Sequence, residues 1–137
     1  ITNTDSCAGS ISQWAALEAL TGPQEDHHKM MQSFTRRRNL IVEKLNDLEG
    51  ITCLKPGGAF YVWPNVTELC SMVGAESAEA LRKRLLHEAN VAVLADSQFG
   101  TPVPGEGHHL RFSYATSDAN IDKGLERIRD WTKNAKR

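Results

Sequence analysis

Cysteine is scarce in this sequence, and its few residues are not spaced for a cysteine-rich site. Cys7, Cys53 and Cys70 are odd in number and form no CxxC pair in a chain of 137 residues. This spacing argues against a disulfide framework and against a zinc site. We therefore expect reduced thiols, no bound metal, and the cytoplasm as the default location.

The chain also lacks an excess of either charge and any long apolar run. Sixteen Lys and Arg residues nearly balance seventeen Asp and Glu residues, for a net charge of −1. Such a balance gives no global field that would attract nucleic acid or an anionic membrane. No apolar run approaches the roughly 20 residues of a membrane span. Neither nucleic acid nor a membrane is therefore expected as a partner.

Familiar catalytic motifs are missing as well. The sequence contains no GxGxxG, P-loop or HExxH motif and suggests no Ser-His-Asp arrangement. The adjacent pairs His27-His28 and His108-His109 diverge on a helix and on a strand alike, which disfavours a shared metal ion. These patterns therefore predict no catalytic, cofactor-binding or metal-binding residue.

Apolar periodicity predicts an α+β fold, with helices on one face of a small mixed or antiparallel sheet. The longest element is a helix near 23–48, in which Phe34, Ile41 and Leu45 fall on one stripe. Shorter helices are expected to begin at three candidate caps, Ser10, Ser77 and Ser117. Short strands are expected near 51–54, 59–63, 91–94 and 109–115.

Turn-forming residues separate these elements. Lys55-Pro56-Gly57-Gly58 is typical of a tight turn, so strands 51–54 and 59–63 are predicted to form a hairpin. Asn90 can adopt the left-handed conformation that ends a helix. The Pro- and Gly-rich residues after Ala95 predict a long loop, and such loops are often functional.

The strand near 109–115 carries the most informative polar residue. Leu110, Phe112 and Tyr114 recur with a period of two, which predicts one buried face. Arg111 lies on the opposite face. It is either a solvated arginine or a planar fork that holds a carboxylate or phosphate bidentately. The alternation alone leaves both interpretations open.

Two adjacent aromatic residues pose a similar choice. Phe60 and Tyr61 lie on opposite faces of their strand, so one of them is expected to point out of the core. The alternative is that both pack between the sheet and the helices.

An ordered set of segments resembles the fold-type I pyridoxal-phosphate aminotransferases, close to the aspartate aminotransferases. The likeness covers nearly all 137 residues and corresponds to the C-terminal, small domain of class I/II members. One departure is Ala95-Asp96, where many family members have Pro-Gly, so this turn is chemically different. The matching segments are ITNTDSCAGSISQWAALEALTGPQE, RRRNLIVEKL, PGGAFYVWP, VAVLADSQFG and LRFSYATS.

The resemblance implies roles for two residues and a reaction for the parent enzyme. Arg111 matches the arginine that grips the substrate's α-carboxylate, and Phe60 matches an aromatic residue near the substrate-binding cleft that takes no chemical part. The implied reaction transfers an amino group between an α-amino acid and a 2-oxo acid, with pyridoxal 5'-phosphate as cofactor, in a cytoplasmic homodimer. Aspartate is the leading substrate, and aromatic or kynurenine-type substrates stay open.

The resemblance also implies that residues 1–137 are one small domain of a longer enzyme. The family's Schiff-base lysine lies in a large cofactor-binding domain, and none of the seven lysines here has its sequence context. The start at Ile1, without methionine, agrees with a fragment. The N-terminal lead-in and the long helix are expected to link to the large domain, and the isolated fragment is expected to be inactive.

A function from another class stays open. Aminotransferase-like domains also occur fused to DNA-binding domains in transcription regulators, where they sense amino acids or cofactor. The resemblance therefore allows a ligand-sensing domain as the alternative to an enzyme.

Overall fold

The computed structural model describes residues 7–135, and the chain divides into two units within one long helix. The first unit extends to Ser33 and contains helix α1 (Ser10–Thr21) and the first turns of helix α2 (Glu25–Asn46). The second unit begins at Phe34 and contains the rest of α2 together with all the strands.

Helix α1 presents its large apolar side chains to solvent. Trp14 is 71% exposed and Ile11 is 86% exposed. No residue of α1 is buried by any part of the chain that the structure describes.

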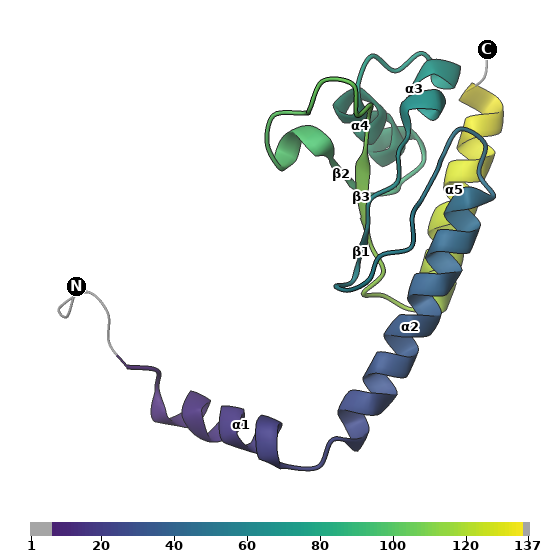
Figure 1. Ribbon diagram of the computed structural model, residues 1–137. Coiled ribbons are helices and arrows are strands. Elements are labelled where there is room, and N and C mark those ends of the chain that lie inside the picture. The colour runs from purple at the N-terminus through teal and green to yellow at the C-terminus, as the bar shows by residue number, and fades with distance from the viewer. Residues whose placement is uncertain (1–6, 136–137) are drawn as a thin grey trace. The chain divides into compact units, whose positions relative to one another are not determined.

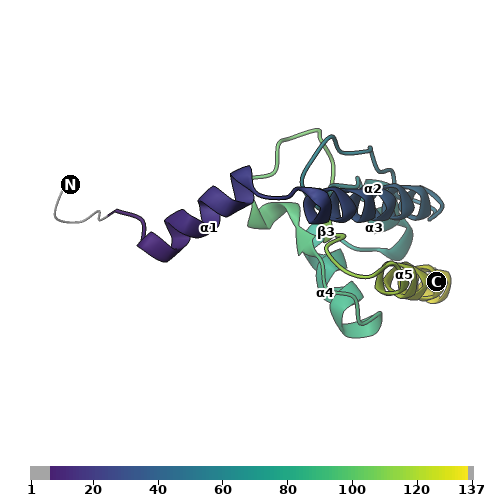
Figure 2. The ribbon, with the colours of Figure 1, turned by 90° about the horizontal axis from the view of Figure 1, so that it is seen from below.

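Helix α2 and the last helix, α5 (Asp118–Ala135), lie side by side in the second unit (Figures 1 and 2). Arg36 Nε lies 2.7 Å from Asp118 Oδ2, and Lys44 Nζ lies 2.8 Å from Asp122 Oδ1. The hydrogen bond from Arg36 is the main reason that the pKa of Asp118 is lowered. Because their side chains are partly solvated, these ion pairs contribute little to the free energy of unfolding. They connect the two helices at two points along their length.

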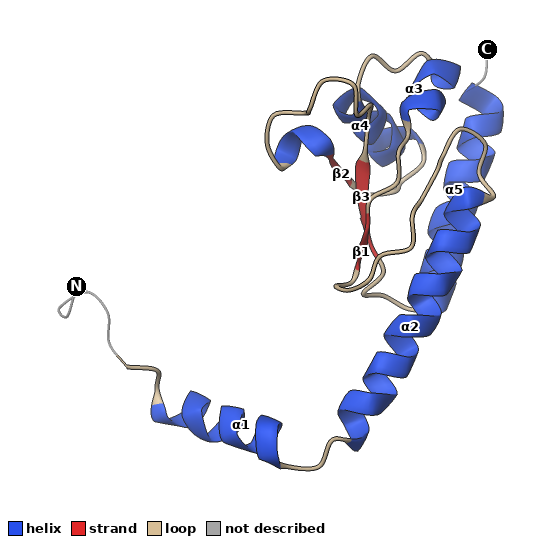
Figure 3. Cartoon of the chain, viewed as in Figure 1, coloured by secondary structure: helices blue, strands red, loops and turns tan. Residues whose placement is uncertain are grey.

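A three-stranded antiparallel sheet lies beside these helices (Figure 3). Its strands are β1 (Tyr61–Val62), β2 (Leu94–Ala95) and β3 (Leu110–Ser113), in the order β1-β3-β2. The register places Val62 opposite Phe112 and Ala95 opposite Leu110. The strand predicted to carry Arg111 is therefore the central one.

One face of the sheet joins a single hydrophobic core with α2, α5 and two shorter helices, α3 (Thr67–Val73) and α4 (Ala78–Glu88). Helices thus share a core with one sheet face, and the predicted α+β fold is confirmed. Core side chains that are at most 1% exposed include Leu45, Val62, Leu69, Leu81, Leu85, Leu110, Tyr114 and Ile128.

The segment 51–54 is not a strand, and the hairpin predicted with 59–63 does not form. Only Thr52 pairs there, in a single bridge to Asn65. The side chain of Asn46 explains the difference, because its Nδ2 donates to the Cys53 carbonyl at 2.9 Å and its Oδ1 accepts from the Cys53 N–H at 2.8 Å. The backbone of Cys53 is thereby removed from the ladder, and β1 pairs with β3 instead.

The other strands are also shorter than predicted, for similar local reasons. The N–H of Val91 donates to the Leu85 carbonyl at the end of α4, so the chain becomes extended only near β2. Ala59 has a φ of +58°, which delays the start of β1. Pro64 has no N–H to continue β1.

Most of the predicted helix signals are confirmed. The Ser77 side chain accepts from the Ala80 N–H at 3.2 Å, and the Ser117 side chain accepts from the Asn120 N–H at 3.2 Å. Asn90 has a φ of +54°, as expected after a helix. Ser10 is the exception, because it is the first residue of α1 and not its cap.

None of the described helices is both long and apolar enough to cross a bilayer. The two thiols inside the domain are buried, and burial raises the pKa of Cys53 and of Cys70 to about 11. Both thiols are therefore protonated at neutral pH and behave as small apolar side chains.

Two adjacent leucines of α4 provide a matched test of this core. Leu85 is 1% exposed and Leu86 is 38% exposed. We expect Leu85→Ala to lower the free energy of unfolding by about 2–5 kcal/mol, because it leaves a cavity. Leu86→Ala should cost about 1 kcal/mol. Urea denaturation of both variants measures the difference, and equal losses would contradict the described packing of α4.

Candidate functional site

Arg111 lies on the open face of β3, and two aromatic rings contact its guanidinium. The Cζ atom is 4.2 Å from the ring centroid of Tyr61 and 4.4 Å from that of Phe99. Within residues 7–135, no hydrogen bond or ion pair joins this guanidinium to another side chain. The two rings therefore hold the charged group in place, and no residue of the described part of the chain acts as its acceptor.

The geometry leaves the hydrogen-bonding edge of the guanidinium available. The rings contact the flat group through cation–π interactions, each worth about 0.5–1 kcal/mol at an exposed site. The five N–H groups of arginine point outward in its plane and form a fork that matches a carboxylate. Arg111 can therefore accept a bidentate carboxylate while its ring contacts persist.

The sheet register brings Tyr61 to Arg111. Tyr61 is paired with Ser113, two residues beyond Arg111 on the same face of β3. Leu94 of β2 lies directly opposite Arg111. Neighbours two residues apart across a ladder are within reach of long side chains, which accounts for the ring contact.

Phe99 reaches Arg111 from a tight turn that follows β2. The 3₁₀ turn η1 (Asp96–Gln98) begins there, and the Phe99 N–H donates to the Asp96 carbonyl at 2.9 Å. The Gln98 side chain accepts from the Ala95 N–H at 2.9 Å. These two bonds close the turn and set the position from which the Phe99 side chain leaves the backbone.

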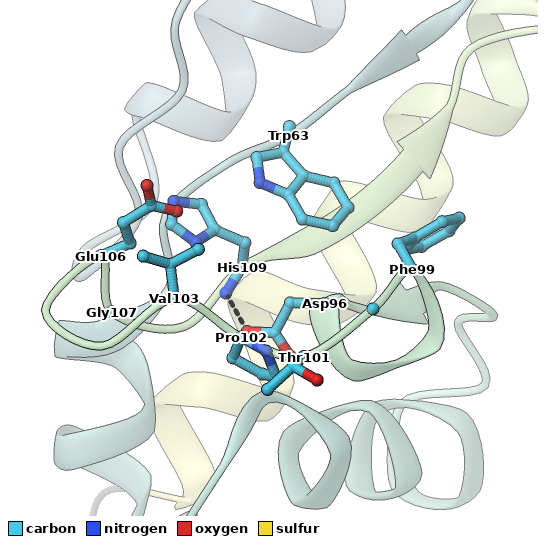
Figure 4. Close-up of a pocket in the computed structure, with 10 residues that line it drawn as sticks. Trp63, Asp96, Phe99, Thr101, Pro102, Val103, Glu106, Gly107 and His109 are labelled. Carbon is cyan, nitrogen blue, oxygen red and sulfur yellow. Dashed lines mark hydrogen bonds between the residues drawn. The ribbon is translucent and has the colours of Figure 1, made fainter.

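A small cavity of about 140 Å³ lies beside Phe99, with Trp63 and His109 among its walls (Figure 4). The Trp63 and His109 rings are stacked, with centroids 5.7 Å apart and planes at 9°. Trp63 also meets Phe99 edge-on at 5.5 Å. Complete small-molecule sites usually enclose about 300–1,000 Å³. This cavity is therefore too small for a complete substrate pocket, and Arg111 is not among the residues that line it.

Phe60, the second residue predicted from the sequence, packs against Tyr61, and Tyr61 in turn contacts Arg111. Its ring is 4.4 Å from that of Tyr61 and 6.3 Å from that of Phe34, and the residue is 41% exposed. Tyr61, and not Phe60, makes the direct contact with the guanidinium. A role for Phe60 near the substrate stays a prediction.

Sequence reasoning missed several residues around Arg111. Tyr61 and Trp63 are two apart, and this alternation could have placed both on the face of Arg111 once β1 was paired with β3. Phe99 comes from a turn with no periodic signal, so its contact with Arg111 could not be read from spacing.

The described lysines do not form an enclosed site. Lys55 and Lys123 are exposed. Four others pair with carboxylates, namely Lys29, Lys44, Lys83 and Lys133. Lys136 lies outside the described residues. Across the described range, no group of three or more His, Cys, Asp or Glu side chains is arranged to hold a metal ion.

Comparisons with known proteins identify the family to which this chain is similar. The family model described as "Aminotransferase class I and II" matches residues 2–128. An aspartate aminotransferase of Geobacillus stearothermophilus is 43% identical over 119 residues, which cover 87% of this chain and 29% of that protein. An aspartate/prephenate aminotransferase of Cereibacter sphaeroides is 41% identical over 124 residues, covering 87% and 30%.

Solved structures give the same result. The crystal structure of the aspartate aminotransferase from Rhizobium meliloti superposes with a TM-score of 0.83 at 35% identity. The match covers 96% of this chain and 33% of that one. The chain thus spans about a third of the length of the relatives that it matches.

Two glycines of the loop before β3 allow a matched test of how this site is built. Both have a positive φ, +88° at Gly105 and +80° at Gly107. A Cβ at Gly107 would collide with Thr67 Oγ1, whereas a Cβ at Gly105 meets nothing within 4 Å. Gly107→Ala should therefore destabilise the chain by about 1–3 kcal/mol more than Gly105→Ala, because only the first adds overpacking to backbone strain. Chemical denaturation measures both, and a larger loss for Gly105→Ala would contradict the packing of this loop.

Proposed function

Because the chain belongs to the class I and II aminotransferase family, we propose that it is the substrate-carboxylate-binding part of a pyridoxal-phosphate-dependent aminotransferase. The observation that carries this proposal is the Arg111 guanidinium, which two rings hold and which no described side chain pairs with. A fixed, unpaired guanidinium on a rigid strand is suited to an incoming carboxylate.

In this proposal Arg111 binds the α-carboxylate of the amino acid and sets its orientation. A bidentate pair fixes two atoms of the carboxylate and therefore restricts rotation of the substrate about its Cα. Reactions that move a proton at Cα depend on this alignment, because misplacement of the reacting atoms by about 1 Å can cost 100-fold in rate. Arg111 thus contributes to positioning as well as to affinity.

Aspartate is the amino donor that we propose first. This choice of donor rests on the names of the relatives, which are aspartate and aspartate/prephenate aminotransferases. Aromatic and kynurenine-type donors are the alternatives. The same names favour an enzyme over a ligand-sensing domain of a transcription regulator.

We further propose that residues 1–137 form the small domain of a longer, homodimeric, cytoplasmic enzyme. The support is that the relatives are about three times as long as the match. Their family implies pyridoxal phosphate, which needs a lysine for its Schiff base. The described lysines are exposed or pair with carboxylates, so they do not fit that role. The part of the reaction that we assign to this chain is therefore limited to the substrate carboxylate.

Substitution of Arg111 in the complete enzyme tests the proposal. Loss of one member of a desolvated charge pair costs about 2–5 kcal/mol, so Arg111→Ala should lower kcat/KM for an amino acid roughly 30- to several-thousand-fold. Arg111→Lys should recover little, because a point charge cannot reproduce the fork. Single-turnover transamination, measured with the amino acid and with its decarboxylated amine, gives the ratio that reports the carboxylate contact.

An exposed arginine of α5 supplies the control for this experiment. Arg129→Ala removes an equal side chain from a different element. It should leave the ratio between amino acid and amine unchanged. If Arg111→Ala slows both substrates equally, Arg111 is not the carboxylate anchor and the proposal is wrong.

Borohydride trapping tests the assignment of the cofactor lysine. The 137-residue chain is mixed with pyridoxal phosphate and reduced, and the adducts are mapped by mass spectrometry. We expect scattered, substoichiometric labelling, because the described lysines are solvated or ion-paired. A complete aminotransferase serves as the control and should be labelled at one lysine. Labelling of one lysine in the short chain at close to one adduct per molecule would show that it does hold a cofactor site.

A further inference from the structure

The carboxylate of Asp96 joins two backbone segments close to Arg111. Its Oδ1 accepts from the N–H of Ser97 at 2.7 Å. Its Oδ2 accepts from the N–H of His109 at 3.0 Å, as Figure 4 shows. The N–H of Asp96 in turn donates to the carbonyl of His109 at 3.1 Å. Asp96 and His109 are therefore joined by two hydrogen bonds, one of which the charged carboxylate accepts.

These bonds fix the start of β3. The ladder between β2 and β3 ends at the pair Ala95 and Leu110. The two bonds to His109 continue this pairing by one residue beyond the strand. Since Arg111 is only two residues further along, the height and twist of its backbone depend on this end of the ladder.

The same residue fixes the turn that delivers Phe99. Asp96 begins η1, and its main-chain carbonyl accepts the Phe99 N–H at 2.9 Å. The side chain of Asp96 contributes to the same turn, because its Oδ1 accepts the Ser97 N–H at 2.7 Å. The Phe99 ring then contacts the Arg111 guanidinium at 4.4 Å. Asp96 thus holds the two segments that meet at Arg111, one carrying the arginine and the other carrying a ring against it.

We infer that Asp96 is a positioning residue for the carboxylate site, acting on Arg111 through His109 and Phe99. This inference rests on the proposed function of Arg111. Among the described residues, Asp96 pairs with no lysine or arginine, so its charge is balanced by the backbone N–H groups. Asp96 also lies near the buried thiol of Cys70 and adds to the burial effect that raises the pKa of that thiol to about 11.

Substitution of Asp96 in the complete enzyme should change the same ratio that reports Arg111. Couplings within one hydrogen-bond network correspond to a roughly 2- to 150-fold change. Asp96→Ala should lower the preference for an amino acid over its decarboxylated amine by that factor. A loss of general stability would instead slow both substrates alike and leave the ratio unchanged.

Asp96→Asn supplies the conservative variant. Its single acceptor oxygen can still receive the His109 N–H, so it should retain more of the ratio than Asp96→Ala. Asp130→Ala provides a matched control on α5, where the carboxylate lies 3.5 Å from the exposed Lys133 and has no other partner within residues 7–135. This control should leave the ratio at the parent value. Equal losses in Asp96→Asn and Asp96→Ala would overturn the role of the His109 bond.

A double-substitution cycle separates this inference from the proposed function. When Arg111 is already alanine, Asp96→Ala should have no further effect on the ratio. If Arg111→Ala itself leaves the ratio intact, the proposed function has failed. If Arg111→Ala lowers the ratio but Asp96→Ala does not, only the inference has failed.

A second variant keeps the inference testable if Asp96→Ala does not fold. Phe99→Leu leaves the Asp96 bonds in place and removes the ring from Arg111. Phe99 is 49% exposed, so the fold should tolerate the change. It should lower the ratio in the same direction as Asp96→Ala. An unchanged ratio in Phe99→Leu would overturn the route through the turn.

Discussion

The burial of one face of β3 is the constraint from which the arrangement of the site follows. Leu110 and Phe112 must lie in the core, and a strand has a period of two, so Arg111 can only point to the other face. A shift of one residue would bury the guanidinium and expose two large apolar side chains. Burial of Leu110 and Phe112 thus fixes the direction of Arg111, although the guanidinium itself lies outside the core.

Two aromatic rings then restrict the conformation of the Arg111 side chain. An arginine on an open sheet face would normally sample many rotamers, and ordering it costs side-chain entropy. Tyr61 and Phe99 reduce that freedom by contacting the guanidinium, and no described residue pairs with its charge. A carboxylate partner from the protein would have held Arg111 more firmly, but it would have competed with any ligand. The ring contacts therefore order the Arg111 side chain and leave its N–H groups available to a ligand.

The sequence is informative wherever a local rule and the tertiary fold agree. The long helix, the caps at Ser77 and Ser117 and the direction of Arg111 follow from periodicity and capping. The strand limits do not, because distant side chains and helix ends claim backbone groups that a strand would use, as Asn46 does with Cys53. The surroundings of Arg111 were also hidden, since Phe99 and Asp96 act through a turn whose geometry depends on contacts far apart in the chain.

The shortness of the outer strands has a consequence for how this domain meets other molecules. Each edge of the sheet is a strand of only two residues, and Pro64, which lacks an N–H, follows one of them. Exposed edges are the usual templates on which foreign strands add, whether from a peptide or from a misfolded copy. Edge strands of two residues present very few free backbone N–H and C=O groups to which another strand could bind. Growth of a cross-β assembly from the native sheet is accordingly disfavoured by its own geometry.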